Sequence, residues 1–301
     1  MFSLLSHSGP LINAAMQKAD DKPLNALRAE IDRIDEAMHR LLMERGEIIN
    51  RLIAVKRSHD SGSAFRPARE AEMMRRLVER HKGILPLDTA ESIWRVIIST
   101  FTYVQAPFSV HADLSAGDAA MRDSARFHFG FTVPFVAHMG AASAVAAVSA
   151  SKGDLALVPA ETAGGGAWWT ALEFDAAPKI IARLPFVERA DHPAALPVFV
   201  VARGAADAMA NETAMWSVRV SGWSPKVAQG IGKAVEFSAV PDATDEGAAL
   251  LLSIPESLKI DGVKDAIVKA GATVRSSTLV GSHARRYTVA ADGKHAAAAK
   301  R

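Results

Sequence analysis

The run LRAEIDRIDEAMHRLLMERGEIINRLIAVKR, residues 27–57, decides the fold of the N-terminal part of the chain. Its apolar residues recur every three or four positions, which is the pattern of a long helix packed against another helix. The stripe begins just before the run and comprises Leu24, Leu27, Ile31, Ile34, Met38, Leu41, Ile48, Leu52 and Val55. We therefore expect a helix from residue 24 to about Lys56. Arg45 occupies one position of the stripe, where a charge is costly unless it is paired or binds an anion.

A second helix is expected over residues 69–82. Its apolar face consists of Met73, Met74, Leu77 and Val78. One turn earlier, the same face holds Glu70, which is a second charge at a position that favours an apolar residue. Gly83 is expected to end this helix.

A third helix is expected to end near Gln105. Asp88 is a candidate cap for its first turn, with Glu91 as the reciprocal partner three residues on. Its apolar stripe is Trp94, Ile98 and Phe101, and Gln105 follows one turn later. Each of the three helices thus has a polar group on its apolar face. One such break is typical of a satisfied buried polar residue, whereas breaks in three successive helices favour an active site.

Distances along the first helix constrain how Arg28, Arg45 and Lys56 can share a ligand. Arg28 and Arg45 lie ~25 Å apart along the axis, whereas Arg45 and Lys56 lie ~16 Å apart. Two long side chains can hold a small ligand across the shorter distance only. Arg28 can reach that ligand from a second copy of the helix that runs antiparallel. We therefore expect a homodimer with shared sites.

Three runs resemble the all-helical chorismate mutases: residues 27–57, RPAREAEMMRRL at 66–77 and IWRVIISTFTYVQ at 93–105. That family rearranges chorismate to prephenate without a cofactor. The resemblance implies an intertwined dimer of three-helix domains, with no cofactor and no metal. It implies that substrate is bound by Arg28 of the partner chain, Arg45, Arg69 and Glu70, and that catalysis uses Arg45, Lys56 and Gln105.

These residue types fit the chemistry of that reaction. Chorismate is a dianion, and the planar fork of arginine suits carboxylates. Negative charge collects on the ether oxygen in the transition state, where the resemblance places Lys56 and Gln105 as donors. Two positions depart from the family pattern. Arg66 stands where an acidic residue is frequent, and Phe101 stands where a small residue is common.

The composition is that of a globular protein, with 49% hydrophobic and 23% charged residues. A formal net charge of +2 is too small to indicate binding to nucleic acid or to a membrane surface. The chain has no cysteine, which excludes disulfides and cysteine-ligated metal sites. Residues 1–20 lack the basic start of a signal peptide, so we expect a flexible extension and a cytoplasmic protein.

Short β-like runs alternate with helical runs from residue 107 to 207, which predicts an α/β region. GDLALVPAETAGGGAWWTAL at 153–172 and ARLPFVERADHPAALPVFVVARG at 182–204 resemble prephenate dehydratases. The Thr-Arg-Phe run of that family, which supplies its catalytic threonine and arginine, falls on Pro197, Val198 and Phe199. No nearby residue obviously replaces the missing hydroxyl and charge, and a lone loop histidine, His192, is expected to be structural. The resemblance therefore implies a degenerate dehydratase.

Residues 208–294 are expected to form a ferredoxin-like order of strand, helix, two strands, helix and strand, with one further strand. GAALLLSIP at 247–255 and the run at 270–293 resemble ACT regulatory domains, which bind amino acids. An aromatic amino acid is therefore a candidate effector, and a purely structural dimerisation sheet is the alternative. Residues 295–301 are expected to be a tail.

The sequence thus predicts a multidomain chain. An all-α three-helix domain over 21–106 is followed by a dehydratase-like α/β region over 107–207 and an ACT-like, ferredoxin-like region over 208–294. The predicted function is that of a chorismate mutase in phenylalanine and tyrosine biosynthesis. Three alternatives remain open: a bifunctional mutase–dehydratase, an isochorismate pyruvate-lyase, and a non-catalytic regulator that binds a dianion.

Overall fold

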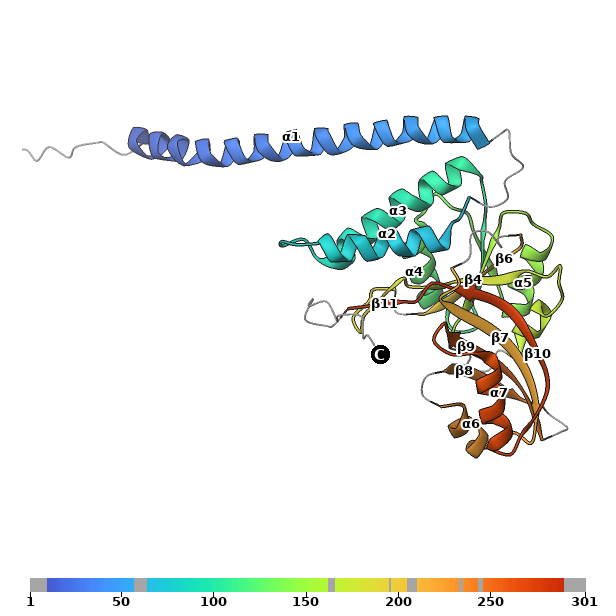
Figure 1. The fold of residues 1–301 in the computed structure, drawn as a ribbon. Helices are drawn as coiled ribbons and strands as arrows, with labels where there is room; N and C mark the ends of the chain where they lie inside the picture. Colours follow the sequence, from blue (N-terminus) through green and yellow to red (C-terminus); the bar gives the residue numbers. More distant parts are fainter. Residues whose placement is uncertain are drawn as a thin grey trace, which may run out of the picture. The chain divides into compact units, whose positions relative to one another are not determined.

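A computed structural model describes residues 10–56, 64–161, 166–194, 196–204, 210–232, 235–242 and 246–289. The chain divides into two compact units, Met1–His59 and Asp60–Arg301. Among the described residues, the first unit contains one long helix, α1. The second unit contains two helices, α2 and α3, which join a mixed α/β structure (Figure 1).

Helix α1 extends over Pro10–Lys56 and is therefore ~70 Å long. It begins at Pro10, earlier than the expected start at residue 24, and the flexible extension over residues 1–20 stays a prediction. Pro10 suits the first turn of a helix, and the residues that follow include the strong helix formers Ala14, Ala15 and Met16. The rest of that predicted extension, residues 1–9, lies outside the described residues.

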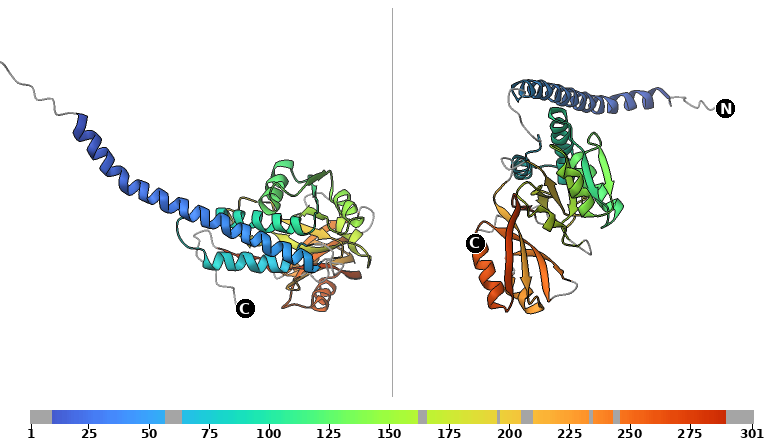
Figure 2. Two further views of the ribbon diagram at one scale, coloured as in Figure 1. Left: turned by 90° about the horizontal axis from the view of Figure 1, so that it is seen from above. Right: turned by 90° about the vertical axis from the view of Figure 1, so that its right-hand side faces the viewer.

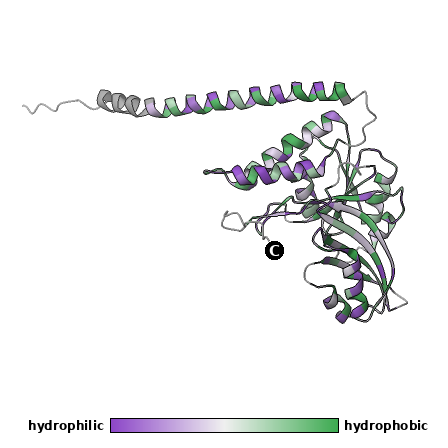
Figure 3. Cartoon of the chain, in the orientation of Figure 1, coloured by the Kyte–Doolittle hydropathy of each residue, from purple (hydrophilic) through white to green (hydrophobic). Residues whose placement is uncertain are grey.

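The predicted apolar stripe of α1 is exposed. The exposed fractions of its side chains range from 36% at Leu52 to 65% at Val55. Hydrophobic and hydrophilic residues alternate along the described side chains of the helix (Figure 3). A surface helix that carries such a stripe gains stability by burying it against a partner.

Helices α2 (Pro67–Arg80) and α3 (Leu87–Gln105) bury apolar side chains in the core of the second unit. Met74, Leu77, Val78 and Ile98 belong to one cluster with Phe108, Val110, Met121 and other residues of the α/β region. The buried face of α2 is the predicted one and includes Glu70. These two helices therefore pack through their apolar faces against the α/β region of the same unit.

The orientation of α3 was predicted only in part. Its buried residues are Ala90, Glu91, Arg95, Ile98, Ser99 and Thr102. Trp94, which belongs to the predicted stripe, is 36% exposed, whereas its neighbour Arg95 is fully buried. The predicted cap was wrong, because α3 begins at Leu87 and its cap position, Pro86, makes no side-chain capping bond.

A nine-stranded sheet forms the framework, in the order β2-β1-β3-β6-β4-β10-β7-β9-β8. Its first part consists of β1 (Val110–Asp113), β2 (Phe135–His138), β3 (Leu155–Pro159), β4 (Lys179–Leu184) and β6 (Val198–Ala202). Strand β1 is parallel to β2 and β3, and β6 is antiparallel to β3 and β4. Between the strands lie α4 (Asp118–Phe129), α5 (Ala141–Ser149) and the short helix η1 (Trp168–Leu172). Strands β5 (Val187–Glu188) and β11 (Tyr287–Thr288) pair separately.

The remaining elements follow the predicted ferredoxin-like order. They are β7 (Thr213–Ser221), α6 (Pro225–Ile231), β8 (Glu236–Pro241), β9 (Gly247–Pro255), α7 (Ile260–Lys269) and β10 (Thr273–His283). Their four strands are antiparallel neighbours. Helices α6 and α7 lie together on one face of these strands (Figure 2), over an apolar cluster that includes Val227, Val263 and Ile267. The opposite face of these strands packs against the α/β region.

Gly281 joins the two parts of the sheet. It pairs with Ile180, so that β10 runs beside β4. The φ angle of Gly281 is +150°, and a Cβ there would lie 2.1 Å from the carbonyl oxygen of Ile180. Only glycine permits this approach. One sheet therefore contains strands from both sides of the expected domain boundary between residues 207 and 208. The expected domain boundaries stay predictions.

Candidate functional site

Three of the predicted site residues lie on α1. Arg28 is exposed, and its Nη1 donates a 3.4 Å hydrogen bond to Oδ1 of Asn25 on the same helix. Arg45 is half-buried. Lys56 is the last residue of α1, and its side chain lies outside the described part of the structure. Because α1 is continuous from Arg28 to Arg45, the ~25 Å axial separation of these two residues holds in the structure.

The other three predicted residues lie on the second unit. Arg69 is exposed in the first turns of α2, and Glu70 beside it is 4% exposed. Gln105 is the last residue of α3, and its Nε2 donates a 3.0 Å hydrogen bond to the carbonyl oxygen of Phe101. The structure thus places the six residues on the three expected helices.

Glu70 forms a buried ion pair that the sequence did not reveal. Arg95 Nη1 donates to Glu70 Oε2 at 2.7 Å, and Arg95 Nη2 donates to the carbonyl oxygen of His128 at 3.1 Å. Burial raises the pKa of Glu70, although the Arg95 guanidinium acts in the opposite direction. Removing one partner of such a pair leaves an uncompensated buried charge, which costs about 3–5 kcal/mol. Arg95 therefore fixes the position of the Glu70 carboxylate.

A second buried carboxylate, Glu91, continues this polar cluster. Its Oε2 lies 3.4 Å from Arg189 Nη1, and its Oε1 lies 3.4 Å from His192 Nε2. Glu91 is thus not the capping partner that we predicted, because its carboxylate faces two groups of a distant loop. The amide of Ala194 donates to His192 Nδ1 at 3.0 Å. His192 is buried and has partners on both ring nitrogens, which fits the predicted structural role.

Two buried histidines make stability depend on pH. Burial lowers the pKa of His128 well below its ordinary value, with help from Arg95 and His192. Burial also lowers the pKa of His283 to about 4. The unfolded chain therefore binds protons below about pH 6.5 that the folded chain does not bind. These residues contribute stability that is present above that pH and is lost as the pH falls.

We expect the free energy of unfolding to fall by up to about 1.4 kcal/mol per pH unit for each of these two histidines below about pH 6.5. Urea unfolding at several pH values measures this slope. His128→Phe should reduce it by one histidine's share, whereas His39→Phe, at an exposed position of α1, should not. An unchanged slope in the His128→Phe protein would show that His128 is not buried as a neutral ring.

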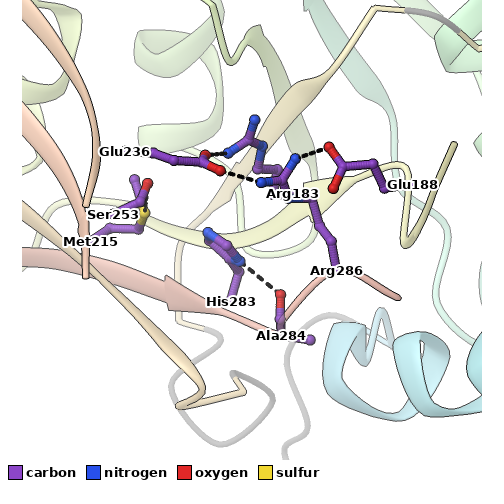
Figure 4. Close-up of polar contacts among 8 residues, drawn as sticks. All are labelled: Arg183, Glu188, Met215, Glu236, Ser253, His283, Ala284 and Arg286. Carbon is purple, nitrogen blue, oxygen red and sulfur yellow. Dashed lines mark hydrogen bonds and ion pairs between the residues drawn. The ribbon is translucent and has the colours of Figure 1, made fainter. Parts of the chain in front are cut away.

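The second unit also contains a cavity of about 720 Å³ between two parts of the sheet. It is lined by Ala160, Glu161, Arg183, Glu188, Pro197, Phe199, Glu236, Phe237, Ser238, Ala239, Leu251, Ser253 and Arg286. Four of these side chains form a chain of alternating charge. Arg183 and Arg286 both bind Glu236, and Arg286 also binds Glu188 (Figure 4).

The cavity contains positions that the dehydratase resemblance singled out. Pro197 and Phe199 line it, and Pro197 immediately precedes β6, as its missing N–H requires. Arg183 lies opposite Phe199 in the register of β4 and β6. Arg183 is thus a charged neighbour of these positions that the sequence alone did not reveal, and the expected loss of dehydratase chemistry stays a prediction. Arg183 and Phe199 become neighbours only when β4 pairs with β6.

Residues 27–106 match the family described as chorismate mutase type II. The chain carries a chorismate mutase type II domain. This domain includes α1 from Leu27 onward, α2 and α3, and it contains all six predicted site residues. It therefore extends over both compact units.

Relatives of the chorismate mutase domain continue beyond it. The bifunctional chorismate mutase/prephenate dehydratase of Neisseria gonorrhoeae is 27% identical over 151 residues, which cover 50% of this chain and 41% of that protein. The enzyme of the same name from Pseudomonas aeruginosa is 29% identical over 153 residues, covering 50% of this chain and 42% of that protein. Residues 1–106 can supply at most 106 of the 151 aligned residues, so the similarity extends into the dehydratase-like region. The chain spans less than half of the length of these relatives.

A solved prephenate dehydratase in complex with L-Phe, from Arthrobacter aurescens, is 12% identical, covers 64% of this chain and 93% of that chain, and has a TM-score of 0.38. This likeness is too low to indicate a common fold. Within the described residues, no group of three or more His, Asp or Glu side chains could hold a metal ion. None of the described helices combines the length and apolarity that a membrane span requires.

Proposed function

We propose that the protein is a chorismate mutase that rearranges chorismate to prephenate. The observation that carries this proposal is the family match over residues 27–106, a range that includes all six predicted site residues. The reaction is a pericyclic rearrangement, so it requires neither a nucleophile nor a cofactor. Binding and orientation of the substrate supply the catalysis.

Each residue has a role that its chemistry supports. Arg28 and Arg45 bind the two carboxylates of the substrate, because guanidinium groups pair with carboxylates in a bidentate way. Lys56 and Gln105 donate hydrogen bonds to the ether oxygen, where negative charge grows in the transition state. Arg69 adds positive charge beside Glu70. These roles are supported by residue type and by position within the matched domain.

Glu70 is assigned to the ring hydroxyl of the substrate. In the second unit its carboxylate is buried and accepts a hydrogen bond from Arg95 at 2.7 Å. That bond uses Oε2 and holds the carboxylate in one orientation. A carboxylate held in this way needs less reordering to accept a second hydrogen bond, from the substrate. Arg95 is therefore a positioning residue in this proposal.

The active unit is a homodimer with shared sites. The exposed apolar stripe of α1, which runs from Leu24 to Val55, supplies the surface that a second α1 covers. An antiparallel pair brings Arg28 of one chain to Arg45 of the other, which the ~25 Å along a single helix cannot do. Dimerisation thus both buries the stripe and completes the site.

The region after residue 106 has a different role from dehydration of prephenate. The positions of the catalytic threonine and arginine of dehydratases hold Pro197 and Val198, so the hydroxyl is missing. Arg183 supplies a charge on the same cavity, but Glu236 already binds it. The candidate roles are support of α2 and α3 and binding of an aromatic amino acid effector. The expected cytoplasmic location belongs to this proposal too.

Product analysis tests the proposal. Purified protein given chorismate is expected to accumulate prephenate, with phenylpyruvate only at the acid-catalysed background, because the dehydratase hydroxyl is missing. Chromatography of quenched time points measures both products. Parallel reactions with isochorismate, and with Arg45→Ala protein, are the controls.

The alternatives predict other products. Release of pyruvate from isochorismate at a higher rate than chorismate turnover would make the protein a lyase. Enzyme-dependent phenylpyruvate would make it a bifunctional mutase–dehydratase. Binding of chorismate without any product would make it a non-catalytic regulator, and each of these results would contradict the proposal.

A further inference from the structure

Two histidines lie side by side where β2 forms one edge of the nine-stranded sheet. Strands β1 and β2 are parallel, and their register pairs His111 with Val136 and Asp113 with His138. Directly paired residues project from the same face of a sheet, as do residues two apart on one strand. His111 and His138 therefore share one face, and His111 Nδ1 lies 2.9 Å from His138 Nε2. The two rings are thus joined by a hydrogen bond.

The histidine pair is extended at both ends into a chain of four side chains. His138 Nδ1 lies 3.0 Å from the hydroxyl oxygen of Ser143, which belongs to the first turn of α5. At the other end, His111 Nε2 faces the Asp154 carboxylate at 3.6 Å. The amide of Ser109 donates to that carboxylate at 2.6 Å and so fixes its position. The order of the chain is serine, histidine, histidine and carboxylate.

The end groups of this chain set the direction of its hydrogen bonds. A carboxylate only accepts, so His111 Nε2 carries the proton that faces Asp154, and His111 Nδ1 is left as an acceptor. His138 Nε2 then carries a proton and donates it to His111 Nδ1. His138 Nδ1 is left as the acceptor for the hydroxyl of Ser143. A serine beside a histidine base, with a further group that holds the base in one tautomer, is the arrangement that activates a nucleophile.

The surroundings of His138 suit it to take up a proton at neutral pH. Partial burial lowers the pKa of His138, and His111 lowers it further, although Asp113 acts in the opposite direction. The ring is therefore neutral at pH 7. A general base must be unprotonated before the reaction, so this state is the competent one.

The loop between the histidine and the serine is held in place from below. Asp113 is buried, and its Oδ1 accepts hydrogen bonds from the amides of Gly140 at 3.0 Å and Ser115 at 2.9 Å. The amide of Leu114 donates to the carbonyl oxygen of His138 at 2.9 Å. These bonds tie the end of β2 and the start of α5 to the end of β1. Base and hydroxyl therefore keep their relative positions, as a reactive pair requires.

The serine is open to a substrate. Ser143 is exposed, and so are Met139 and Val136, which supply apolar surface beside His138. Val136 lies on the same face as the two histidines. The first amides of α5 have no partner within the helix and can donate to an oxyanion that forms at Ser143. These neighbours suit a small ester with a short apolar acyl group.

We propose that Ser143 is a nucleophile and that this face of the protein hydrolyses small carboxylic esters. As Ser143 Oγ attacks the ester carbonyl carbon, His138 Nδ1 takes the hydroxyl proton, and it gives this proton to the alcohol oxygen as the bond to the alcohol breaks. Water then attacks the acyl-serine and gives a proton to His138, which returns it to Oγ as the acid leaves. The net reaction consumes one ester and one water and yields one acid and one alcohol. None of the four residues lies within the mutase domain, residues 27–106.

Hydrolysis of p-nitrophenyl acetate and p-nitrophenyl butyrate by the full-length protein tests the proposal. Ser143→Ala should abolish protein-dependent release of p-nitrophenolate, and His138→Gln should lower kcat/KM by about 10²-fold or more, because the general base is lost. Ser149→Ala is the matched control and should not change the rate. Ser149 lies on the same helix, but its hydroxyl donates to the carbonyl oxygen of Val145. Mass spectrometry of quenched reactions should find the acyl group on the peptide that contains Ser143.

His111→Phe tests the positioning role of the second histidine. His111 acts only through His138, so the variant should lower kcat by at least about tenfold and leave KM nearly unchanged. Thermal unfolding verifies that each variant is folded, which separates this effect from a loss of stability.

Several results would overturn the proposal. Wild-type hydrolysis by the Ser143→Ala protein would show that an imidazole or another side chain reacts with these activated esters. An acyl group found only on other residues would exclude Ser143 as the nucleophile. Release of p-nitrophenolate no faster than with the same concentration of free imidazole would exclude the activity. Wild-type kcat in the His111→Phe protein would show that the chain of four side chains does not act as a unit. None of these results depends on mutase activity.

Discussion

Arg45→Ala and Lys56→Ala are each expected to lower kcat/KM for chorismate by about 10²–10³-fold while the dimer stays folded. In the proposed site, each change removes a charge-assisted hydrogen bond to the substrate or to the ether oxygen of the transition state. Such bonds contribute roughly 1.5–3 kcal/mol, and more where water is excluded.

Steady-state kinetics on both variants measures this effect. Arg40→Ala, at an exposed position of the same helix, is the matched control for loss of positive charge from α1. Its kcat/KM should stay within about threefold of wild type, because an exposed charge contributes little at this range. Wild-type kcat/KM in both the Arg45→Ala and Lys56→Ala proteins would contradict the assignment of the site.

Local patterns in the sequence were sufficient for several elements. Helix α2 buries the predicted face, which includes Glu70. The order from β7 to β10 was also predicted, because turns separate runs of clear strand or helix period. These features depend on neighbours a few residues apart, which a sequence displays directly.

The buried face of α3 could not be predicted from the spacing of its apolar residues. Ile93, Trp94, Val96, Ile97 and Ile98 are apolar on almost every side of the helix. A hydrophobic pattern that surrounds a helix does not select one face. The buried face is decided by Arg95 and Glu91, which pair with residues 25 to 101 positions away. Contacts over such separations become visible only with the tertiary fold.

The cavity charges were missed for the same reason. Arg183, Glu188, Glu236 and Arg286 come from four different segments, and none belongs to a motif. The sequence comparison with dehydratases directed attention to Pro197 and Val198, and it therefore suggested that the region had lost its charged residues. The pairing of β4 with β6, and the ion pair between Arg183 and Glu236 of β8, bring charged side chains close to Pro197 and Phe199.

Restoration of activity by mixing two inactive chains tests the central claim most directly. The claim is that this protein is a chorismate mutase whose sites are shared between two copies of α1. Arg28→Ala and Arg45→Ala homodimers each have two damaged sites. In a mixed antiparallel dimer, one site receives both defects and the other receives none, because the two sites are related by twofold symmetry.

The measurement is the rate of prephenate formation after equal amounts of the two variants exchange subunits. Random exchange should yield about a quarter of the wild-type number of intact sites, and therefore about a quarter of the wild-type rate. Subunit exchange is verified with two distinguishable tags, and each variant mixed with itself is the control. Activity that rises from the background to this level is the predicted result. No recovery after verified exchange would show that Arg28 and Arg45 do not act across a dimer, and would contradict the account.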